Sequence, residues 1–372
     1  MAASKVYFTD MRCTPGRSLQ QKLEKLIRTA GIGDIDMNNQ FVAIKTHFGE
    51  PGNLAFLRPN FSKTVADVIK SEGGVPFLTD CNTLYVGRRK NAIEHIDAAY
   101  ENGFSPLSTG CQIIIADGLK GTDDVEVPVN GGEYCKTAKI GRAIMDADVF
   151  ISLSHFKGHE LAGFGGALKN IGMGCGSRAG KMEQHHSGKP TVHTDICRGC
   201  RKCSQYCAQH AIIFVDGKAF IDHNKCAGCG RCIGICNFDA IENTVYGAEH
   251  DLCCKIAEYT KAVIDGRPSF HIVVVMDVSP YCDCHGESDT PLIQDVGIFA
   301  SFDPVAVDQA CFDAVHNCQP LPGTLLTDSQ VDGKTSGDYF HDIFDNTNGE
   351  DMLEHAEKIG IGTRSYELIT VK

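Results

Sequence analysis

Two cysteine runs share one spacing: Cys197-x2-Cys200-x2-Cys203-x3-Cys207 and, 29 residues later, Cys226-x2-Cys229-x2-Cys232-x3-Cys236. In this spacing three close thiolates hold one iron–sulfur cube, and the fourth cysteine of each run reaches across to the other cube. On this logic one cluster is held by Cys197, Cys200, Cys203 and Cys236. The other is held by Cys226, Cys229, Cys232 and Cys207. The spacing therefore predicts two [4Fe–4S] clusters in a compact segment with internal pseudo-symmetry.

Other cysteine chemistries are disfavoured. A disulfide framework belongs in an oxidising compartment and usually in a small chain. Zinc sites are built from pairs of cysteines, whereas these runs are evenly spaced triples with a fourth member. Over about 55 residues the segment resembles the two-[4Fe–4S] ferredoxin family. One departure is that Ala208 and Asn237 stand where the family usually has proline, which removes no ligand.

Length and charge restrict the classes of partner. The 372 residues are enough for two or three domains. The net charge of −12 disfavours nucleic acid and anionic membranes, which both select basic surfaces. The first residues lack the apolar core of a signal peptide, and no stretch approaches the ~20 apolar residues of a membrane span. We therefore expect a cytoplasmic protein, in which nineteen cysteines are tolerated.

Outside the cysteine segment, strand and helix patterns alternate, which predicts an α/β fold: a mostly parallel sheet with helices on both faces. The expected strands are 5–9, 41–46, 75–79, 111–117, 149–153, 271–278 and 297–300. The expected helices are 18–30, 59–71, 91–102, 136–146, one along 252–263, one starting at 303–304 and 349–359. Turns dominate 321–336.

The cysteine segment is predicted to be an insert. Polar residues with Gly188 and Pro190 mark the entry near 182–194, and a short hairpin pattern follows the first cysteine run. We expect residues 1–187 and 248–372 to form one α/β domain, with residues 188–247 as an inserted ferredoxin-type α+β module. A separate C-terminal domain is the alternative.

A second constellation, rich in His, Lys and Gly, occupies residues 152–189 after a buried strand. Open α/β sheets bind ligands at the carboxyl ends of their strands. The candidate catalytic residues are His155, Lys157, His159 and Lys169, joined by His47 after an earlier strand. Candidate cofactor-binding residues are Gly163, Gly165 and Gly166, because glycines allow close backbone approach. The pattern lacks the spacing of the phosphate-binding and dinucleotide-binding loops. The alternative is that the glycines form only tight turns.

A third cluster, Cys282-Asp-Cys284-His285, follows another apolar strand and should lie at the same edge of the sheet. Thiols and imidazoles so close together can bind a soft metal ion. Cys282 and Cys284 are therefore candidate metal ligands, and free thiols in a loop are the alternative.

Three motifs resemble one family: Lys45-Thr-His47-Phe-Gly, the run from His155 through Lys169 to Gly174, and Asp303-Pro-Val-Ala-Val-Asp308. They resemble the domain-of-unknown-function family three-six-two, whose members often carry a ferredoxin insert. The resemblance covers nearly the whole chain. It implies an iron–sulfur protein of anaerobic metabolism, with no settled chemistry for the α/β part.

A shorter motif is His159-x3-Gly163-x2-Gly166-x2-Lys169, with His185 sixteen residues further on. It resembles the core of the nickel-pincer lactate racemase family. That resemblance implies cofactor attachment at Lys169, metal ligation by His185 and proton transfer by His159. The rest of that family's pattern is not evident, so the motif indicates a shared fold.

Three functions follow from these patterns. The first is an iron–sulfur electron-transfer protein whose α/β part docks a redox partner protein or a small ligand. The second is a ferredoxin-coupled oxidoreductase, with a flavin or an additional metal ion at the His/Lys/Gly-rich loop and a small-molecule substrate. The third is a non-catalytic partner protein that responds to redox state or oxygen.

Overall fold

An eight-stranded sheet forms the centre of the computed structural model, which describes residues 3–84, 87–185, 189–226, 228–242 and 249–372. Its strand order is β16-β1-β15-β14-β7-β2-β3-β4. The bounds are β1 Ser4–Asp10, β2 Phe41–Lys45, β3 Val75–Asp80, β4 Gln112–Ile115, β7 Val149–His155, β14 Ser269–Val275, β15 Gly297–Ser301 and β16 Tyr366–Thr370. Only β15 runs antiparallel to its neighbours in this sheet. The predicted mostly parallel α/β fold is confirmed.

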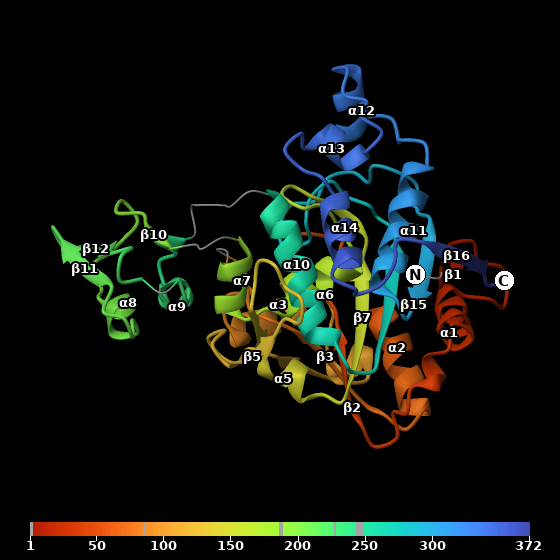
Figure 1. Cartoon of the computed structure of the whole chain (residues 1–372), viewed down its shortest axis with the longest axis horizontal. Helices are drawn as coiled ribbons and strands as arrows, with labels where there is room; N and C mark the ends of the chain where they lie inside the picture. The colour runs from red at the N-terminus through yellow and green to blue at the C-terminus, as the bar shows by residue number, and fades with distance from the viewer. Residues whose placement is uncertain (1–2, 85–86, 186–188, 227, 243–248) are drawn as a thin grey trace.

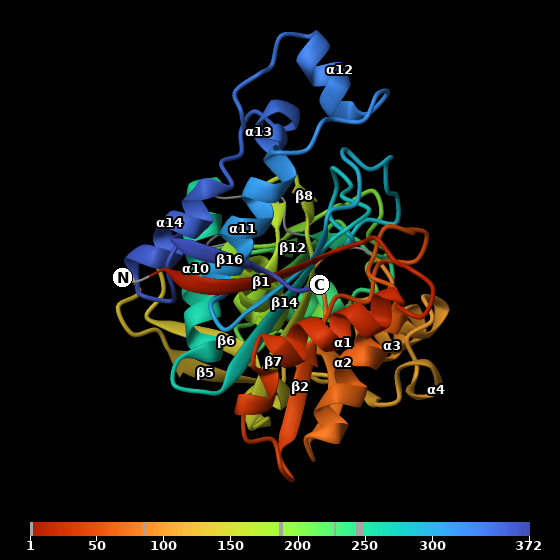
Figure 2. The same ribbon diagram turned by 90° about the vertical axis from the view of Figure 1, so that its right-hand side faces the viewer.

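Helices cover both faces of the sheet (Figures 1 and 2). Side chains alternate between the faces along each strand. In β14, Ile272 and Val274 therefore join the core under α1 (Leu19–Thr29) and α2 (Pro59–Ser71). Val273 and Val275 join the opposite core under α10 (Glu249–Ile264) and α11 (Pro304–His316). Burial on both faces explains why this strand is a continuous apolar run.

The two parts of the chain that flank the cysteine runs share this sheet. Strands β14 and β15, from the second part, lie between β1 and β7 of the first, and β16 pairs with β1. The predicted boundaries at 187/188 and 247/248 fall outside the described residues and stay predictions. We call the sheet and its helices the body.

Residues 189–242, described except for 227, form what we call the cluster module. It projects from the body beside α7 (Arg178–His185), as Figure 1 shows. Its elements are β10 Thr191–Val192, α8 Lys202–Gln205, β11 Ile212–Val215, β12 Lys218–Ile221, α9 Arg231–Ile235 and β13 Ile241–Glu242. Strand β10 pairs with β13, and β11 with β12, both antiparallel. Left-handed backbone conformations recur 29 residues apart, at 199 and 228, 201 and 230, and 210 and 239. The two halves are therefore repeated in backbone as well as in sequence.

Two local predictions were wrong. The expected helix over 136–146 is instead β6 (Thr137–Gly141) followed by a short α5 (Arg142–Asp146). Strand β6 pairs with β5 (Asp124–Pro128), and this tertiary pairing overrides the local helical spacing. The turn region 321–336 contains α12 (Leu325–Val331), which begins at a capping box formed by Thr324 and Thr327.

The remaining elements are short or peripheral. They are a 3-10 turn at Ile32–Asp34, α3 Ala92–Glu101, α4 Pro106–Thr109, β8 Lys157–His159, β9 Gly163–Gly165, α6 Ala167–Cys175, α13 Tyr339–Ile343 and α14 Glu350–Lys358. Among the described residues, no helix has both the length and the apolar character needed to cross a bilayer.

Candidate functional site

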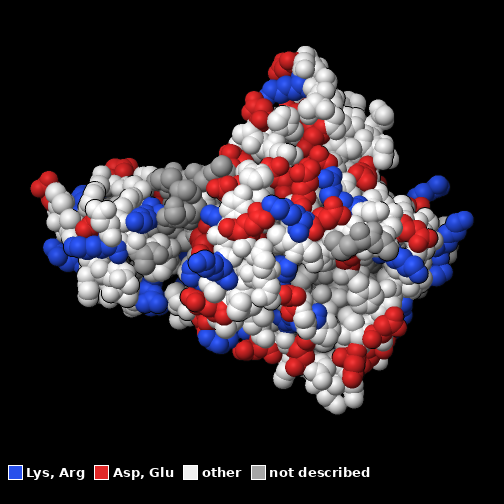
Figure 3. Space-filling model, in the orientation of Figure 1, with Lys and Arg blue, Asp and Glu red and all other residues white. Residues whose placement is uncertain are grey.

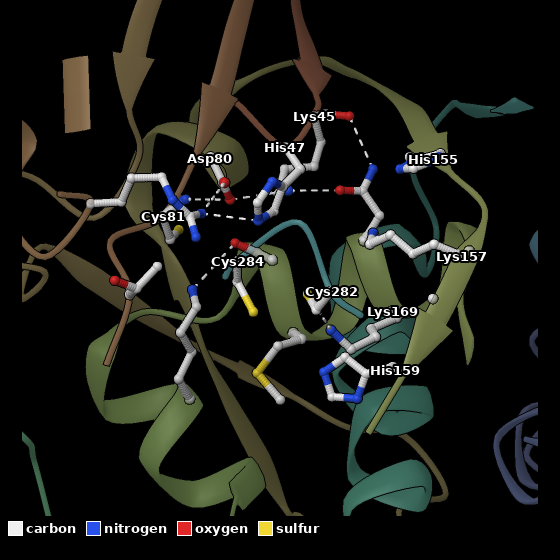
Figure 4. A pocket seen from close by; sticks show the side chains of 18 of the residues that line it. Lys45, His47, Asp80, Cys81, His155, Lys157, His159, Lys169, Cys282 and Cys284 are labelled. Atoms are coloured by element: carbon white, nitrogen blue, oxygen red, sulfur yellow. Dashed lines mark hydrogen bonds and ion pairs between the residues drawn. The ribbon is translucent and has the colours of Figure 1, made fainter. Parts of the chain in front are cut away.

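A deep pocket opens at the carboxyl edge of the parallel strands (Figure 4). The last residues of three neighbouring strands are Lys45 in β2, Asp80 in β3 and His155 in β7. Because the strands are parallel, these residues lie at the same edge of the sheet. The empty space, including open solvent at the mouth, measures about 790 Å³. Its wall is rich in basic and imidazole side chains: Lys45, His47, Arg89, His155, Lys157, His159, Lys169, Lys181 and His185.

The structure brings together most of the residues predicted for a site. His47, His155, Lys157, His159, Lys169, His185, Gly165, Gly166, Cys282 and Cys284 all line the pocket. Gly163 is not among the lining residues. It is the first residue of β9 and has φ +73°, and a Cβ there would lie 2.7 Å from the Gly349 backbone nitrogen. A Cβ on Gly166 would overlap the Asp308 carboxylate. Packing alone therefore requires glycine at both positions, and their cofactor-binding role stays a prediction.

Lys45 and Arg89 place cationic groups at the floor of the pocket. The Lys45 ammonium contacts Asp80 Oδ1 at 3.0 Å and donates to Asn170 Oδ1 at 2.8 Å. Burial raises the pKa of Asp80, but the combined positive charges of Lys45, His95, Lys181 and Arg89 outweigh it, so the net shift is downward. Arg89 pairs with Glu50 at 2.8 Å, and its Nη2 has no partner among the described residues although the side chain is buried.

Burial and the neighbouring Arg89 together set the protonation state of His47. Arg89 Nη1 lies 2.9 Å from His47 Nε2, and the backbone N–H of Gly49 lies 3.0 Å from His47 Nδ1. Burial lowers the pKa of His47, and the Arg89 charge lowers it further. His47 is therefore neutral at physiological pH, and its one acceptor nitrogen can take a hydrogen bond from only one of these two groups.

His155 is occupied at both ring nitrogens. Nδ1 lies 2.9 Å from Asp283 Oδ2 and Nε2 lies 2.7 Å from the Met276 carbonyl oxygen. Lys157 Nζ lies 3.3 Å from the same Asp283 carboxylate. Burial raises the pKa of Asp283, but His155 and Lys157 reverse this and hold it well below its usual range. This arrangement suits His155 to positioning the loop that carries Asp283.

Lys169, His159 and Cys282 meet on the opposite wall (Figure 4). The Lys169 ammonium lies 3.8 Å from Cys282 Sγ. His159 Nδ1 accepts from the backbone N–H groups of Leu161 and Ala162, each at 3.1 Å. These bonds assign the ring proton to Nε2. Burial, reinforced by Lys169, lowers the pKa of His159, so its neutral form is favoured.

His185 lies at the end of α7, where it is buried in the pocket wall. Burial lowers its pKa to about 3, and Lys169 and Lys181 add to the effect. Its imidazole is therefore neutral at physiological pH. Neutrality is the protonation state that a metal-binding histidine needs.

In the cluster module, the cysteines gather as two interleaved sets. A cavity is lined by Cys197, Cys200, Cys203 and Cys236. The Cys232 thiol interacts electrostatically with Cys229 and Cys226 of its own run and with Cys203 and Cys207 of the other. Backbone N–H groups point at the sulfurs of both halves in matching pairs, from Gly199 to Cys197, Gly228 to Cys226, Ala211 to Cys207 and Ala240 to Cys236, at 3.3–3.4 Å. Four-thiol sets with such donors fit [4Fe–4S] clusters.

Helix α7 connects the module to the pocket. Gly230 and Gly234, around Cys232, pack directly on Arg178 of α7. Met182 of α7 belongs to the apolar core of the module. Lys181 and His185 of the same helix line the pocket. One helix therefore contacts the second cysteine set and the pocket at once.

The family model described as "Domain of unknown function (DUF362)" matches residues 42–313, which include the pocket and the whole cluster module. This chain belongs to the DUF362 family. The DUF362 match leaves the chemistry open, since the family is defined without a function.

Curated relatives match this DUF362 chain over parts of their length. One subunit of an ion-translocating oxidoreductase complex from Methanosarcina acetivorans is 46% identical over 46 residues, 12% of this chain and 17% of that protein. Pyruvate synthase subunit PorD of Thermotoga maritima is 39% identical over 56 residues, 14% of this chain and 56% of that protein. A thylakoid-associated protein of Synechocystis is 27% identical over 167 residues, 42% and 45% of the two chains. The chain thus spans at most 56% of the length of these relatives.

Two solved structures are distantly similar. A Thermotoga maritima protein aligns with a TM-score of 0.37 and 14% identity over 80% of this chain and 58% of its own. The lactate racemase apoprotein of Thermoanaerobacterium thermosaccharolyticum aligns with a TM-score of 0.34 and 12% identity over 74% and 51%. At these scores neither alignment bears on the chemistry of the DUF362 chain.

Sequence reasoning assigned no role to three members of the pocket: Lys45, Asp80 and Arg89. Lys45 and Asp80 stand at strand ends, a position that signals an edge residue of an α/β sheet. Arg89 lies in a loop with no pattern to mark it. Asp283, between the two predicted cysteines, was passed over although it is fully buried and paired.

Proposed function

We propose that this chain is an iron–sulfur electron-transfer protein with two [4Fe–4S] clusters. The observation that carries the proposal is the interleaved gathering of the eight cysteines, with backbone N–H donors on their sulfurs in both halves. Such clusters, when bound, accept and release one electron each. The short similarities to an ion-translocating oxidoreductase subunit and a pyruvate synthase subunit support an iron–sulfur electron-transfer role.

Paired substitutions test the interleaving. Cys203→Ser combined with Cys236→Ser removes ligands of one cluster, so about four of about eight irons should remain. Cys203→Ser combined with Cys232→Ser removes a ligand from each cluster, so nearly all iron should be lost. Iron and sulfide are measured on anaerobically purified protein, with Cys318→Ser as the control. Equal iron loss in both pairs would contradict the assignment.

The second candidate is a ferredoxin-coupled oxidoreductase that acts on an anionic small molecule. It is favoured by α7, which reaches both the second cysteine set and a pocket with buried cations. In this proposal Lys157 and Lys169 bind carboxylate or phosphate oxygens, and the buried wall excludes water. The His159 Nε2–H can donate a proton to the bound molecule. A flavin or additional metal ion would occupy the same pocket.

Substitutions in the pocket separate this candidate from a simple electron carrier. Protein reduced with dithionite, whose cluster absorbance is bleached, is mixed with a panel of carboxylates and phosphate esters. The recovery of that absorbance then measures the rate at which each compound reoxidises the clusters. A substrate should reoxidise the wild type rapidly and Lys169→Ala at least about tenfold more slowly, with iron content unchanged. Lys70→Ala, on the outer surface of α2, is the matched control. If no compound reoxidises the wild type faster than buffer, the oxidoreductase candidate fails and the carrier remains.

A further inference from the structure

A carboxylate, a thiol and an imidazole lie close together beside the pocket, whose wall includes the thiol residue Cys284. One oxygen of Glu160, Cys284 Sγ and one ring nitrogen of His285 all lie within 4.8 Å of one another. Zinc-type ions bind such atoms at roughly 2.0–2.3 Å, which places neighbouring ligand atoms ~3–4 Å apart. Small side-chain rotations would therefore bring these three atoms to the spacing of ligands around one ion.

The two elements that carry these groups are held firmly in place. Glu160 lies in the tight turn between β8 and β9. The loop with Cys284 and His285 is fixed at three points, of which the first is the Asp283 side chain, bound to His155 and Lys157. The Asp283 carbonyl accepts from the Glu50 N–H at 2.9 Å, and the His285 carbonyl accepts from the Asn53 side chain at 3.1 Å. Supporting contacts of this kind preorganise metal ligands.

Glu160 has an unused oxygen. Its Oε1 accepts from His285 Nε2 at 2.7 Å, whereas its Oε2 is buried and has no hydrogen-bond partner among the described residues. An unpaired buried carboxylate oxygen is costly. A cation bound beside it would satisfy that oxygen, which a simple Glu160–His285 ion pair does not.

We propose that Glu160, Cys284 and His285 bind one divalent transition-metal ion of the zinc type. Magnesium and calcium select all-oxygen ligand sets, whereas mixed sulfur, nitrogen and oxygen ligands select zinc and its neighbours. Cys284 forms part of the pocket wall, so an ion bound to its sulfur would lie beside the cavity that Lys169 and His159 also line. Three protein ligands with one open position are the pattern of catalytic rather than structural zinc sites.

The proposal does not depend on the iron–sulfur assignment. The three ligands come from the body, and none of them belongs to the eight cysteines of the module. The iron content therefore measures occupancy of the two cluster sites, and the zinc content measures occupancy of this site. Either proposal can thus be contradicted without the other.

The test uses the anaerobically purified full chain, incubated with zinc chloride and passed into metal-free buffer. Elemental analysis should find about one zinc per chain in addition to iron. Zinc-edge X-ray absorption should show one sulfur among nitrogen and oxygen neighbours. Cys284→Ser and Glu160→Gln should each weaken zinc binding by at least about tenfold in competition with a chromophoric chelator, with iron unchanged. Cys318→Ser, which removes a similarly half-buried thiol just after α11, should bind zinc as the wild type does.

Three results would overturn the proposal. They are zinc far below one per chain, an all-sulfur zinc environment that marks the module cysteines instead, and unchanged zinc affinity in both variants. If Cys284→Ser loses iron and folds poorly, Glu160→Gln decides, since it preserves the shape of the side chain and removes only its charge.

Discussion

Asp283 is the residue on which the arrangement of the pocket wall depends most. Its carboxylate is buried and is the shared partner of His155 and Lys157. Removing one partner of a buried ion pair leaves the others without compensation and typically costs about 3–5 kcal/mol. Asp283→Ala should therefore lower the melting temperature by several degrees. Asp289→Ala, an exposed carboxylate of the same loop, should change the stability by under about 0.5 kcal/mol.

Circular dichroism of both variants during heating measures this prediction. A melting temperature for Asp283→Ala equal to that of Asp289→Ala would mean that the His155 and Lys157 contacts contribute nothing to folding. The Asp283→Asn variant adds a further check, because it retains a hydrogen-bond acceptor without the charge. Its melting temperature should fall between those of the wild type and Asp283→Ala.

At the residue scale the sequence predicted many of the residues that line the pocket, and their catalytic and cofactor-binding roles stay predictions. His155 was expected as a catalytic group from its place after a buried strand, yet its two nitrogens are bound to Asp283 and the Met276 carbonyl. Those partners lie more than 120 residues away, so no local pattern shows them. Gly166 was expected to approach a cofactor, whereas the close neighbour is the Asp308 carboxylate. Residue types identify a pocket, but the pairing inside it depends on the tertiary fold.

Helix α6 begins at a buried carboxylate from another helix. Asp308 of α11 accepts the first two N–H groups of α6, from Ala167 at 2.6 Å and Leu168 at 2.8 Å. Burial raises the pKa of Asp308 to about 7, although these hydrogen bonds oppose the shift. The folded state thus holds the Asp308 proton more tightly than the unfolded chain, where the pKa is about 3.9.

The sign of the pH dependence follows from this difference. The stability that Asp308 contributes is fully present below about pH 4 and is lost as pH rises to about 7. Asp308→Asn cannot titrate, so the difference in melting temperature between wild type and variant should shrink over this window. Thermal unfolding in a series of buffers from pH 4 to pH 8 measures it. A difference that grows with pH would show that the carboxylate caps α6 in its charged form.

The contact between the module and α7 gives a prediction at the element scale. Gly230 has a left-handed φ of +63°, and a Cβ there would lie 3.0 Å from Met182 Cγ and 3.1 Å from Arg178 Cγ. Its counterpart in the first half, Arg201, has φ +65° but is exposed. Gly230→Ala should therefore add about 1–3 kcal/mol of backbone strain together with a packing conflict.

Arg201→Ala is the matched control, because alanine there keeps the same backbone conformation without meeting a neighbour. Gly230→Ala should lower the melting temperature and the retained iron, whereas Arg201→Ala should leave both close to wild type. Iron per chain after anaerobic gel filtration and the unfolding temperature report the two effects. Equal iron content and equal unfolding temperatures in the two variants would mean that the packing of the module against α7 does not contribute to its stability.

For the whole molecule, the strands of the sheet were largely predictable from the sequence because the central ones are long and apolar and are separated along the chain by helices. Strand β16 was not predicted, since its residues are half exposed and their pairing with β1 is set by the far end of the chain. The β5–β6 hairpin was missed because β6 has the residue spacing of a short helix. The cysteine runs were predictable because ligand spacing is a local property of the chain.

Charge is distributed unevenly between the two parts of the molecule. The chain carries a net charge of −12, yet residues 189–242 contain seven Lys and Arg against five Asp and Glu. Figure 3 shows basic side chains on the module at the left and acidic ones across the middle of the body. The cavity of the first cysteine set is lined by Arg198, Arg201 and Lys202. Since α9 and the second set face α7, this basic end is the part of the module directed away from the body (Figure 1).

Electrons should therefore enter most readily from an anionic donor. Basic side chains around the first cysteine set raise the local concentration of anions and so the rate of encounter. Arg201→Glu combined with Lys202→Glu should slow reduction by dithionite, whose reactive species is anionic, by up to about tenfold at low salt. The same variant should be reduced faster than wild type by the cationic methyl viologen radical. Both differences should shrink above about 0.1 M salt, where the screening length falls to ~10 Å.

Stopped-flow absorbance of the clusters measures both rates under anaerobic conditions. Lys63→Glu combined with Lys334→Glu is the control, because it changes the net charge equally at exposed sites of the body. If this control changes the two rates as much as the module variant does, only the overall charge matters. Opposite responses to the two reductants, confined to the module variant, would instead locate electron entry at the basic side chains around the first cysteine set. A natural donor would then be expected to present an acidic surface to Arg198, Arg201 and Lys202, since complementary charge speeds association.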